Sequence, residues 1–82
     1  MYTIKIKKSP AKFIQSLSIK RQKQIQNIFT QLQYSPYSLP YKKIEEHLLR
    51  IRVGNMRILY EIKENEVCII ILKIGYRENF YS

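Results

Sequence analysis

Residues 48–63 read LLRIRVGNMRILYEIK, which is typical of two short β-strands joined by a tight turn. Gly54 and Asn55 form the predicted turn, and a glycine at its first central position suits type II′. A two-residue turn determines the strand register, so Arg52 faces Arg57 across the pair. One face of the hairpin is then apolar and should be covered by the rest of the chain: Leu49, Ile51, Val53, Met56, Ile58, Tyr60 and Ile62.

The opposite face of this hairpin, which we expect to be exposed, carries Arg50, Arg52 and Arg57. Like charges directly opposite each other destabilise a strand pair, by about 0.2–1 kcal/mol, so stability alone would not select them. Arginine makes bidentate contacts with phosphate, and three on one patch indicate an anion clamp. The alternative is an ordinary solvated face. Whether Arg77 joins the three depends on which face the last strand presents after the turn at residues 64–66. The sequence leaves this open.

The flanking sequence predicts a strand and two helices before the hairpin and one strand after it. Residues 3–7 alternate between apolar and polar, as in a strand. Ser9 and Ser18 are predicted N-caps of a short and a longer helix, which lead into a loop at residues 35–41. Val67–Tyr76 begins with an apolar run, as expected of a strand inside the sheet. The order β-α-α-β-β-β predicts an α+β fold, with two N-terminal helices on one face of a small, largely antiparallel sheet.

Length and charge narrow the class of protein. The 82 residues predict a single domain, 1–82. All of the formal net charge of +9 lies in residues 1–43, which predicts a polyanionic partner: nucleic acid, an acidic protein or an anionic membrane surface. No apolar run nears the roughly 18 residues that span a bilayer, so we expect no membrane segment. The lack of a signal-peptide pattern and the single cysteine, Cys68, predict a cytoplasmic protein.

The inventory of side chains excludes several kinds of catalytic site. The sequence has no Asp, one His and one Cys, so neither a carboxylate-rich metal site nor a zinc site is expected, and it has no glycine-rich phosphate loop. We therefore expect no metal and no cofactor. An enzyme built from these residues would act on a substrate that supplies its own nucleophile. RNA does so through the ribose 2′-hydroxyl, which leaves the protein to orient the phosphate and stabilise its developing charge.

Residues near the C-terminus extend this predicted site. Tyr76 and Tyr81 flank Arg77 and are placed to stack on a base beside a phosphate-binding arginine, although packing within the domain explains them equally well. The predicted RNA-binding residues are Arg50, Arg52, Arg57, Lys73, Tyr76 and Arg77.

Two runs, LRIRVGNMRILYEI at residues 49–62 and IGYRENFY at residues 74–81, resemble the RelE/ParE superfamily of toxins from type II toxin–antitoxin systems. They share with it a basic strand, the turn VGxxR[IV]xY, an apolar strand and then GxRxxxY, and the predicted order of elements also matches. The resemblance implies a RelE-type toxin that cleaves messenger RNA in the ribosomal A site through the 2′-hydroxyl, leaving a 2′,3′-cyclic phosphate. It also implies a cognate RelB-like antitoxin that neutralises the toxin in a hetero-oligomeric complex.

The resemblance also implies roles for individual residues. Arg50 and Arg52 stand where RelE-type toxins place two lysines, and Arg57 matches the arginine after the turn. Arg77 matches the arginine that stabilises or protonates the leaving group, and Tyr81 matches the tyrosine that stacks near the scissile nucleotide. Because arginine does not readily release a proton, neither Arg50 nor Arg52 is a convincing general base.

Two other functions remain open. ParE-like toxins inhibit DNA gyrase without cutting anything, although such members usually lack the full basic set. An inactive RNA-binding relative would result if the arginines at the two lysine positions removed the general base.

Overall fold

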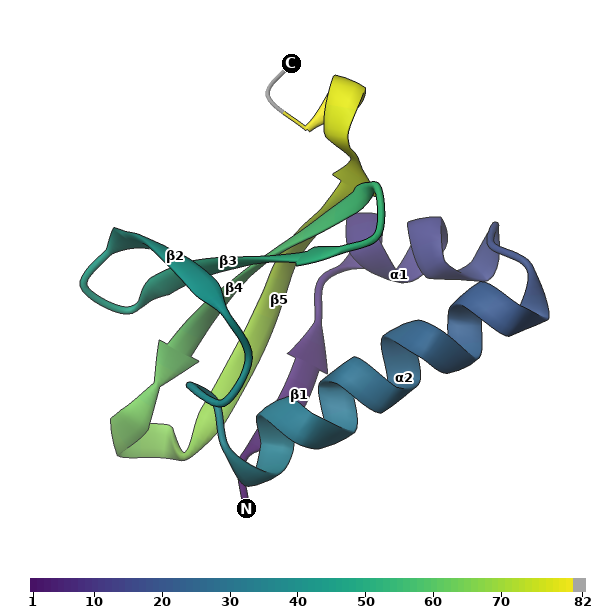
Figure 1. The fold of residues 1–82 in the computed structure, drawn as a ribbon. Helices are drawn as coiled ribbons and strands as arrows, with labels where there is room; N and C mark the ends of the chain where they lie inside the picture. Colours follow the sequence, from purple (N-terminus) through teal and green to yellow (C-terminus); the bar gives the residue numbers. More distant parts are fainter. Residues whose placement is uncertain (81–82) are drawn as a thin grey trace.

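A five-stranded sheet organises the computed structural model, which describes residues 1–80 (Figure 1). The strands run in the order β1-β5-β4-β3-β2; β1 is parallel to β5, and the other neighbours are antiparallel. Both helices pack on one face of the sheet (Figure 1), so the predicted α+β class is confirmed. In chain order the elements are β1 (Thr3–Ile6), α1 (Lys8–Gln15), α2 (Ile19–Tyr34), β2 (Tyr41–Glu45), β3 (Leu48–Val53), β4 (Met56–Lys63), the 3-10 turn η1 (Glu64–Glu66), β5 (Cys68–Tyr76) and the 3-10 turn η2 (Arg77–Asn79).

The strand β2 corrects the predicted order, which places Tyr41 in a loop and assigns no element to residues 42–45. It pairs with β3 at the edge of the sheet, with Tyr41 opposite Ile51 and Lys42 opposite Arg50. All five of its residues are exposed. An edge strand is held by backbone pairing on one side, so it needs no buried apolar face and leaves little hydrophobic pattern in the sequence.

The β3–β4 hairpin forms as predicted. Val53 pairs with Met56 and Arg52 with Arg57, and the register continues without a shift to the start of β3. Gly54 has φ +61°, whereas Asn55 does not have a positive φ. This combination matches the type II′ turn, in which the first central residue alone takes the left-handed conformation.

The two helices begin differently. The N-cap of α1 is Lys7, with no side-chain hydrogen bond, so the prediction of Ser9 is wrong. Ser9 and Pro10 lie within the first helical turn, where N–H groups have no intrahelical partner and proline is tolerated. Ser18 caps α2 as predicted, and its Oγ accepts a hydrogen bond from the Arg21 N–H at 3.3 Å. Neither helix in residues 1–80 has the length and apolar character needed to cross a membrane.

The hydrophobic core lies between the helices and the sheet. Helix α2 contributes Ile25, Phe29 and Leu32, which fall on one helical face. The seven apolar hairpin residues are all buried, as predicted. Tyr60 is fully buried, and its hydroxyl donates a hydrogen bond to the backbone oxygen of Pro36 at 3.1 Å, so burial leaves this polar atom satisfied.

A β-bulge in β5 decides which side chains reach the face opposite the helices, here called the open face. The β4–β5 register shifts between Leu59 and Tyr60, which leaves Leu72 without a partner in the pairing. This extra residue reverses the alternation of β5 from that point on. As a result, Lys73 and Gly75 lie on the open face, beside the arginines of the hairpin.

Candidate nucleic-acid interface

The sheet register places basic residues in two adjacent rows on the open face. The first row crosses β2, β3, β4 and β5 as Lys42, Arg50, Leu59 and Lys73. In the second row Arg52 stands opposite Arg57, as predicted. Together with Arg77, which follows β5, these cations form what we call the basic face: Lys42, Arg50, Arg52, Arg57, Lys73 and Arg77.

Three arginines of the basic face line one hollow of about 290 Å³ beside the hairpin turn: Arg52, Arg57 and Arg77. We call it the arginine hollow. The backbone N–H of Arg77 donates a hydrogen bond to the Asn55 carbonyl at 2.9 Å, which ties the C-terminal turn to the hairpin turn. The position of Arg77, which the sequence leaves open, is therefore beside the hairpin arginines. Guanidinium groups from three elements, β3, β4 and η2, can bind a phosphate through several charge-assisted hydrogen bonds at once.

The three hairpin arginines, all expected to be exposed, differ in how far they are buried. Arg52 is exposed, whereas Arg50 is 8% and Arg57 5% exposed, which corrects that expectation. A buried guanidinium has a restricted orientation and a lower local dielectric, so it interacts more strongly with an anion than a solvated one does. Arg57 is thus a preorganised member of the arginine hollow, and Arg52 is its solvent-facing member.

The C-terminal segment lies close to these arginines. The Phe80 ring centroid lies 4.8 Å from Lys73 Nζ, and the same ammonium donates a hydrogen bond to the Phe80 carbonyl. A Cβ built on Gly75 would meet Phe80 Cδ1 at 3.9 Å, so the ring lies over the strand next to Arg57. Phe80 itself is 5% exposed. The C-terminal turn therefore lies over β5 beside Arg57 and engages Lys73.

Of the two tyrosines predicted to stack on a base, Tyr76 is not brought to the basic face. Tyr76 pairs with Met56 on the helix side, and its ring makes an edge-on contact with Phe13 of α1 at a centroid distance of 5.3 Å. The bulge in β5 explains this correction, because it sends Lys73 to the open face and Tyr76 to the core side. Tyr81 lies outside the described residues.

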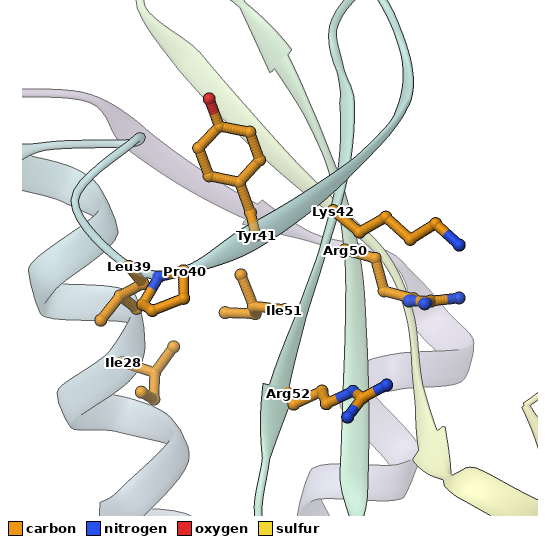
Figure 2. Close-up of a pocket in the computed structure, with 8 residues that line it drawn as sticks. All are labelled: Ile28, Leu39, Pro40, Tyr41, Lys42, Arg50, Ile51 and Arg52. Carbon is orange, nitrogen blue, oxygen red and sulfur yellow. The ribbon is translucent and has the colours of Figure 1, made fainter.

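A second hollow, of about 350 Å³, lies at the edge of β3, where β2 begins. Figure 2 shows its two kinds of lining: apolar side chains toward α2 and cationic side chains toward the open face. We call it the edge groove, and its lining is Ile28, Leu39, Pro40, Tyr41, Lys42, Arg50, Ile51 and Arg52. Lys42 was missed in the sequence because it lies on the unpredicted strand; its pairing with Arg50 is what places it on the basic face.

Within residues 1–80, no three His, Cys, Asp or Glu side chains come together as a group that could hold a metal ion. His47 is exposed in the connection between β2 and β3, and Cys68 is buried at the start of β5. The chemistry of the described site therefore consists of guanidinium and ammonium groups around two hollows.

Several solved structures have this fold. A chain of the archaeal RelE–RelB complex from Pyrococcus horikoshii OT3 is 28% identical, with a TM-score of 0.84 over 95% of this chain and 97% of that chain. A chain of the RelB–RelE antitoxin–toxin complex from Methanococcus jannaschii is also 28% identical, with a TM-score of 0.75 over 94% of each chain. The isolated E. coli RelE toxin is similar in fold at 15% identity, with a TM-score of 0.79 over 93% of this chain and 84% of that chain.

No curated protein matches the chain in sequence. The family model described as the ParE toxin of type II toxin–antitoxin systems, parDE, matches residues 5–81. This match covers nearly the whole chain and agrees with the structural likeness to RelE toxins. The chain therefore belongs to the ParE toxin family, and it is a toxin of the RelE/ParE superfamily of type II toxin–antitoxin systems.

Proposed function

We propose that this toxin is a metal-independent endoribonuclease that cleaves messenger RNA in the ribosomal A site and so inhibits translation. The observation that carries the proposal is the arginine hollow, in which Arg52, Arg57 and Arg77 line a space of about 290 Å³. Lys42, Arg50 and Lys73 extend the positive charge over the adjacent row of the open face. Such a surface suits a polyanion whose scissile phosphate needs charge stabilisation.

In the proposed reaction the RNA supplies the nucleophile. The ribose 2′-oxygen loses its proton and forms a bond to phosphorus, while the bond from phosphorus to the 5′-oxygen breaks and that oxygen takes up a proton. The arginine hollow stabilises the extra negative charge on the phosphate oxygens during this exchange. The products carry a 2′,3′-cyclic phosphate and a 5′-hydroxyl. Among the cations of the described basic face, only Lys42 and Lys73 have a neutral, proton-accepting form, because arginine stays protonated.

We propose a RelB-like antitoxin as the cognate partner, in a cytoplasmic hetero-oligomer. The solved structures from Pyrococcus horikoshii and Methanococcus jannaschii are complexes of RelE with RelB, which supports this assignment for a chain with the same fold. The formal net charge of +9 favours an acidic partner surface as well as RNA. The ribosome is the proposed site of action because it holds the messenger.

The match to the ParE family model supports a second candidate, a toxin without catalytic activity that inhibits DNA gyrase. The basic face favours the first candidate, because a gyrase inhibitor has no need for three arginines around one hollow. The two candidates predict different damage in the cell: broken messenger in one case and gyrase-dependent breaks in DNA in the other.

The test is to incubate the purified toxin with programmed ribosomes and to map the messenger 5′ ends. Cleavage within A-site codons is expected, and Arg52→Gln should slow it. The matched control is Lys23→Gln, which removes an exposed charge from α2 on the other side of the sheet. Intact messenger together with gyrase-dependent DNA damage would support the second candidate instead. Binding of RNA without any cleavage would indicate an inactive relative.

A further inference from the structure

The edge groove exists because β2 stops short of the end of β3. The pairing of these strands begins at Tyr41 opposite Ile51, so β2 offers no partner to Arg52 and Val53 in the described chain. Pro40 precedes β2 and lines the groove, as does Leu39, whose side chain packs against the core. The edge groove beside β3 is therefore lined by the loop before β2, by α2 and by β3.

We propose that the edge groove binds the nucleotide that neighbours the scissile phosphate. The apolar wall would contact its base and the cationic wall its phosphate. This proposal rests on the proposed ribonuclease function and adds a substrate-binding subsite to it. The groove of about 350 Å³ falls in the range of roughly 300–1,000 Å³ that holds small ligands.

The two walls complement the two parts of a nucleotide, its base and its phosphate. Ile28, Leu39 and Ile51 point into the apolar side, whereas Arg50 and Arg52 extend away from it toward the open face, together with Lys42 (Figure 2). A nucleobase has apolar faces, and its phosphate carries the charge. A ligand with both features satisfies both walls, and an apolar molecule or a free anion satisfies only one.

The path of an RNA strand connects the two hollows. Arg52 lines both the arginine hollow and the edge groove, which makes it the shared boundary. A phosphate bound among Arg52, Arg57 and Arg77 therefore has the edge groove as its neighbouring space along β3. An RNA strand that places its scissile phosphate in the first hollow can place the adjoining nucleotide in the second.

A peptide strand fits the same place less well. The part of β3 that lies beyond its pairing with β2 comprises only Arg52 and Val53, after which the turn at Gly54 begins. Strands in proteins usually have about five or six residues, so two provide little backbone pairing for an added strand. The three cations of the groove also favour an anionic ligand.

The test measures binding of a fluorescent RNA hexanucleotide with 2′-O-methyl ribose at every position, which the proposed reaction does not cleave. Lys42→Gln should weaken binding about threefold to tenfold and lower the slope of log Kd against log salt by about 0.7, the value for one phosphate contact on a single strand. Lys43→Gln is the matched control, because Lys43 is the next residue of β2 and does not line the groove.

The apolar wall is tested in the same assay. Leu39→Ala should weaken binding about threefold to tenfold without changing the salt slope, and Leu39→Met should bind like the parent. Val67→Ala, a truncation of an exposed apolar residue outside the groove, is the control. Thermal unfolding of each variant establishes that it is folded at the assay temperature, and Leu39→Met supplies the comparison if Leu39→Ala is not.

The outcomes separate this proposal from the proposed function. If the parent toxin binds the RNA and Arg52→Gln weakens binding, but Lys42→Gln matches Lys43→Gln, the edge groove holds no nucleotide and only this proposal is overturned. If the parent toxin neither binds nor cleaves RNA, the proposed function is overturned as well. If Lys42→Gln and Leu39→Ala spare RNA binding but weaken antitoxin binding, the groove is a protein-binding surface, and this proposal is wrong.

Discussion

Arg52 and Arg57 differ in burial, and replacing each in turn by Gln tests whether this difference affects the stability of the fold separately from the cleavage rate. Both residues line the arginine hollow, and both should contribute to the charge stabilisation of the proposed reaction. Loss of one preorganised contact to a transition state typically slows the chemical step by about 10²- to 10³-fold. We therefore expect Arg52→Gln and Arg57→Gln each to slow messenger cleavage by a factor in this range.

Their effects on the free energy of unfolding should differ. Arg52 is exposed and stands opposite Arg57, so removing its charge relieves a repulsion of up to about 1 kcal/mol. Arg57 is only 5% exposed, and replacing a buried guanidinium removes packing and polar interactions of the folded state, which typically costs about 1–3 kcal/mol. In a domain of this size each kcal/mol changes the melting temperature by about 4–8 °C. Arg52→Gln should melt at or slightly above the parent temperature and Arg57→Gln clearly below it.

The assay combines single-turnover cleavage with thermal and urea unfolding, all on the purified toxin. Cleavage is measured at a temperature at which both variants are folded, so loss of activity does not report loss of structure. A parental cleavage rate in Arg52→Gln would refute the role of the arginine hollow. Equal melting temperatures for the two variants would refute the argument that buried Arg57 stabilises the fold more than exposed Arg52 does.

Three further predictions use other parts of the molecule. Lys73→Gln removes the contacts of the ammonium with the Phe80 carbonyl and ring, so it should lower stability by about 1 kcal/mol, and an unchanged melting curve would contradict this. Burial raises the pKa of Tyr60 from 10.0 to about 12, so the neutral phenol stabilises the fold fully below pH 10 and loses this contribution as pH rises to 12. Urea unfolding between pH 9 and 12 should show that Tyr60→Phe has a weaker pH dependence than the parent; equal dependences would contradict the argument. Cleavage of a Mg²⁺-free RNA substrate should persist in EDTA, and a rate that requires added Mg²⁺ would exclude the metal-independent reaction.

The hairpin was predictable because its determinants are local. Alternating apolar residues and a two-residue turn with glycine first specify the register, and the register specifies which residues share a face. The pairing of Arg52 with Arg57 and the burial of the apolar face follow directly, and both are observed. Ser18 was equally predictable, because an N-cap acts within one turn of its own helix.

The features that the sequence did not reveal depend on distant contacts. The strand β2 is exposed throughout, so only its pairing with β3 identifies it, and Lys42 was missed with it. Arg57 is buried, and the C-terminal segment places Phe80 over Gly75, the residue paired with Arg57. Neither periodicity nor composition contains these contacts, because both describe neighbours along the chain.

The β-bulge in β5 shows how a small feature that depends on strand pairing determines which residues form the site. Val67–Leu72 is apolar on both faces, so nothing in its pattern marks the point at which the register shifts. If Leu72 were paired regularly instead of forming a bulge, alternation would continue from the core-facing part of β5 and would direct Lys73 and Arg77 toward the helices. With it, Arg77 reaches the arginine hollow and Tyr76 packs against α1. The hairpin thus determines which arginines face one another, and the bulge determines that a third joins them.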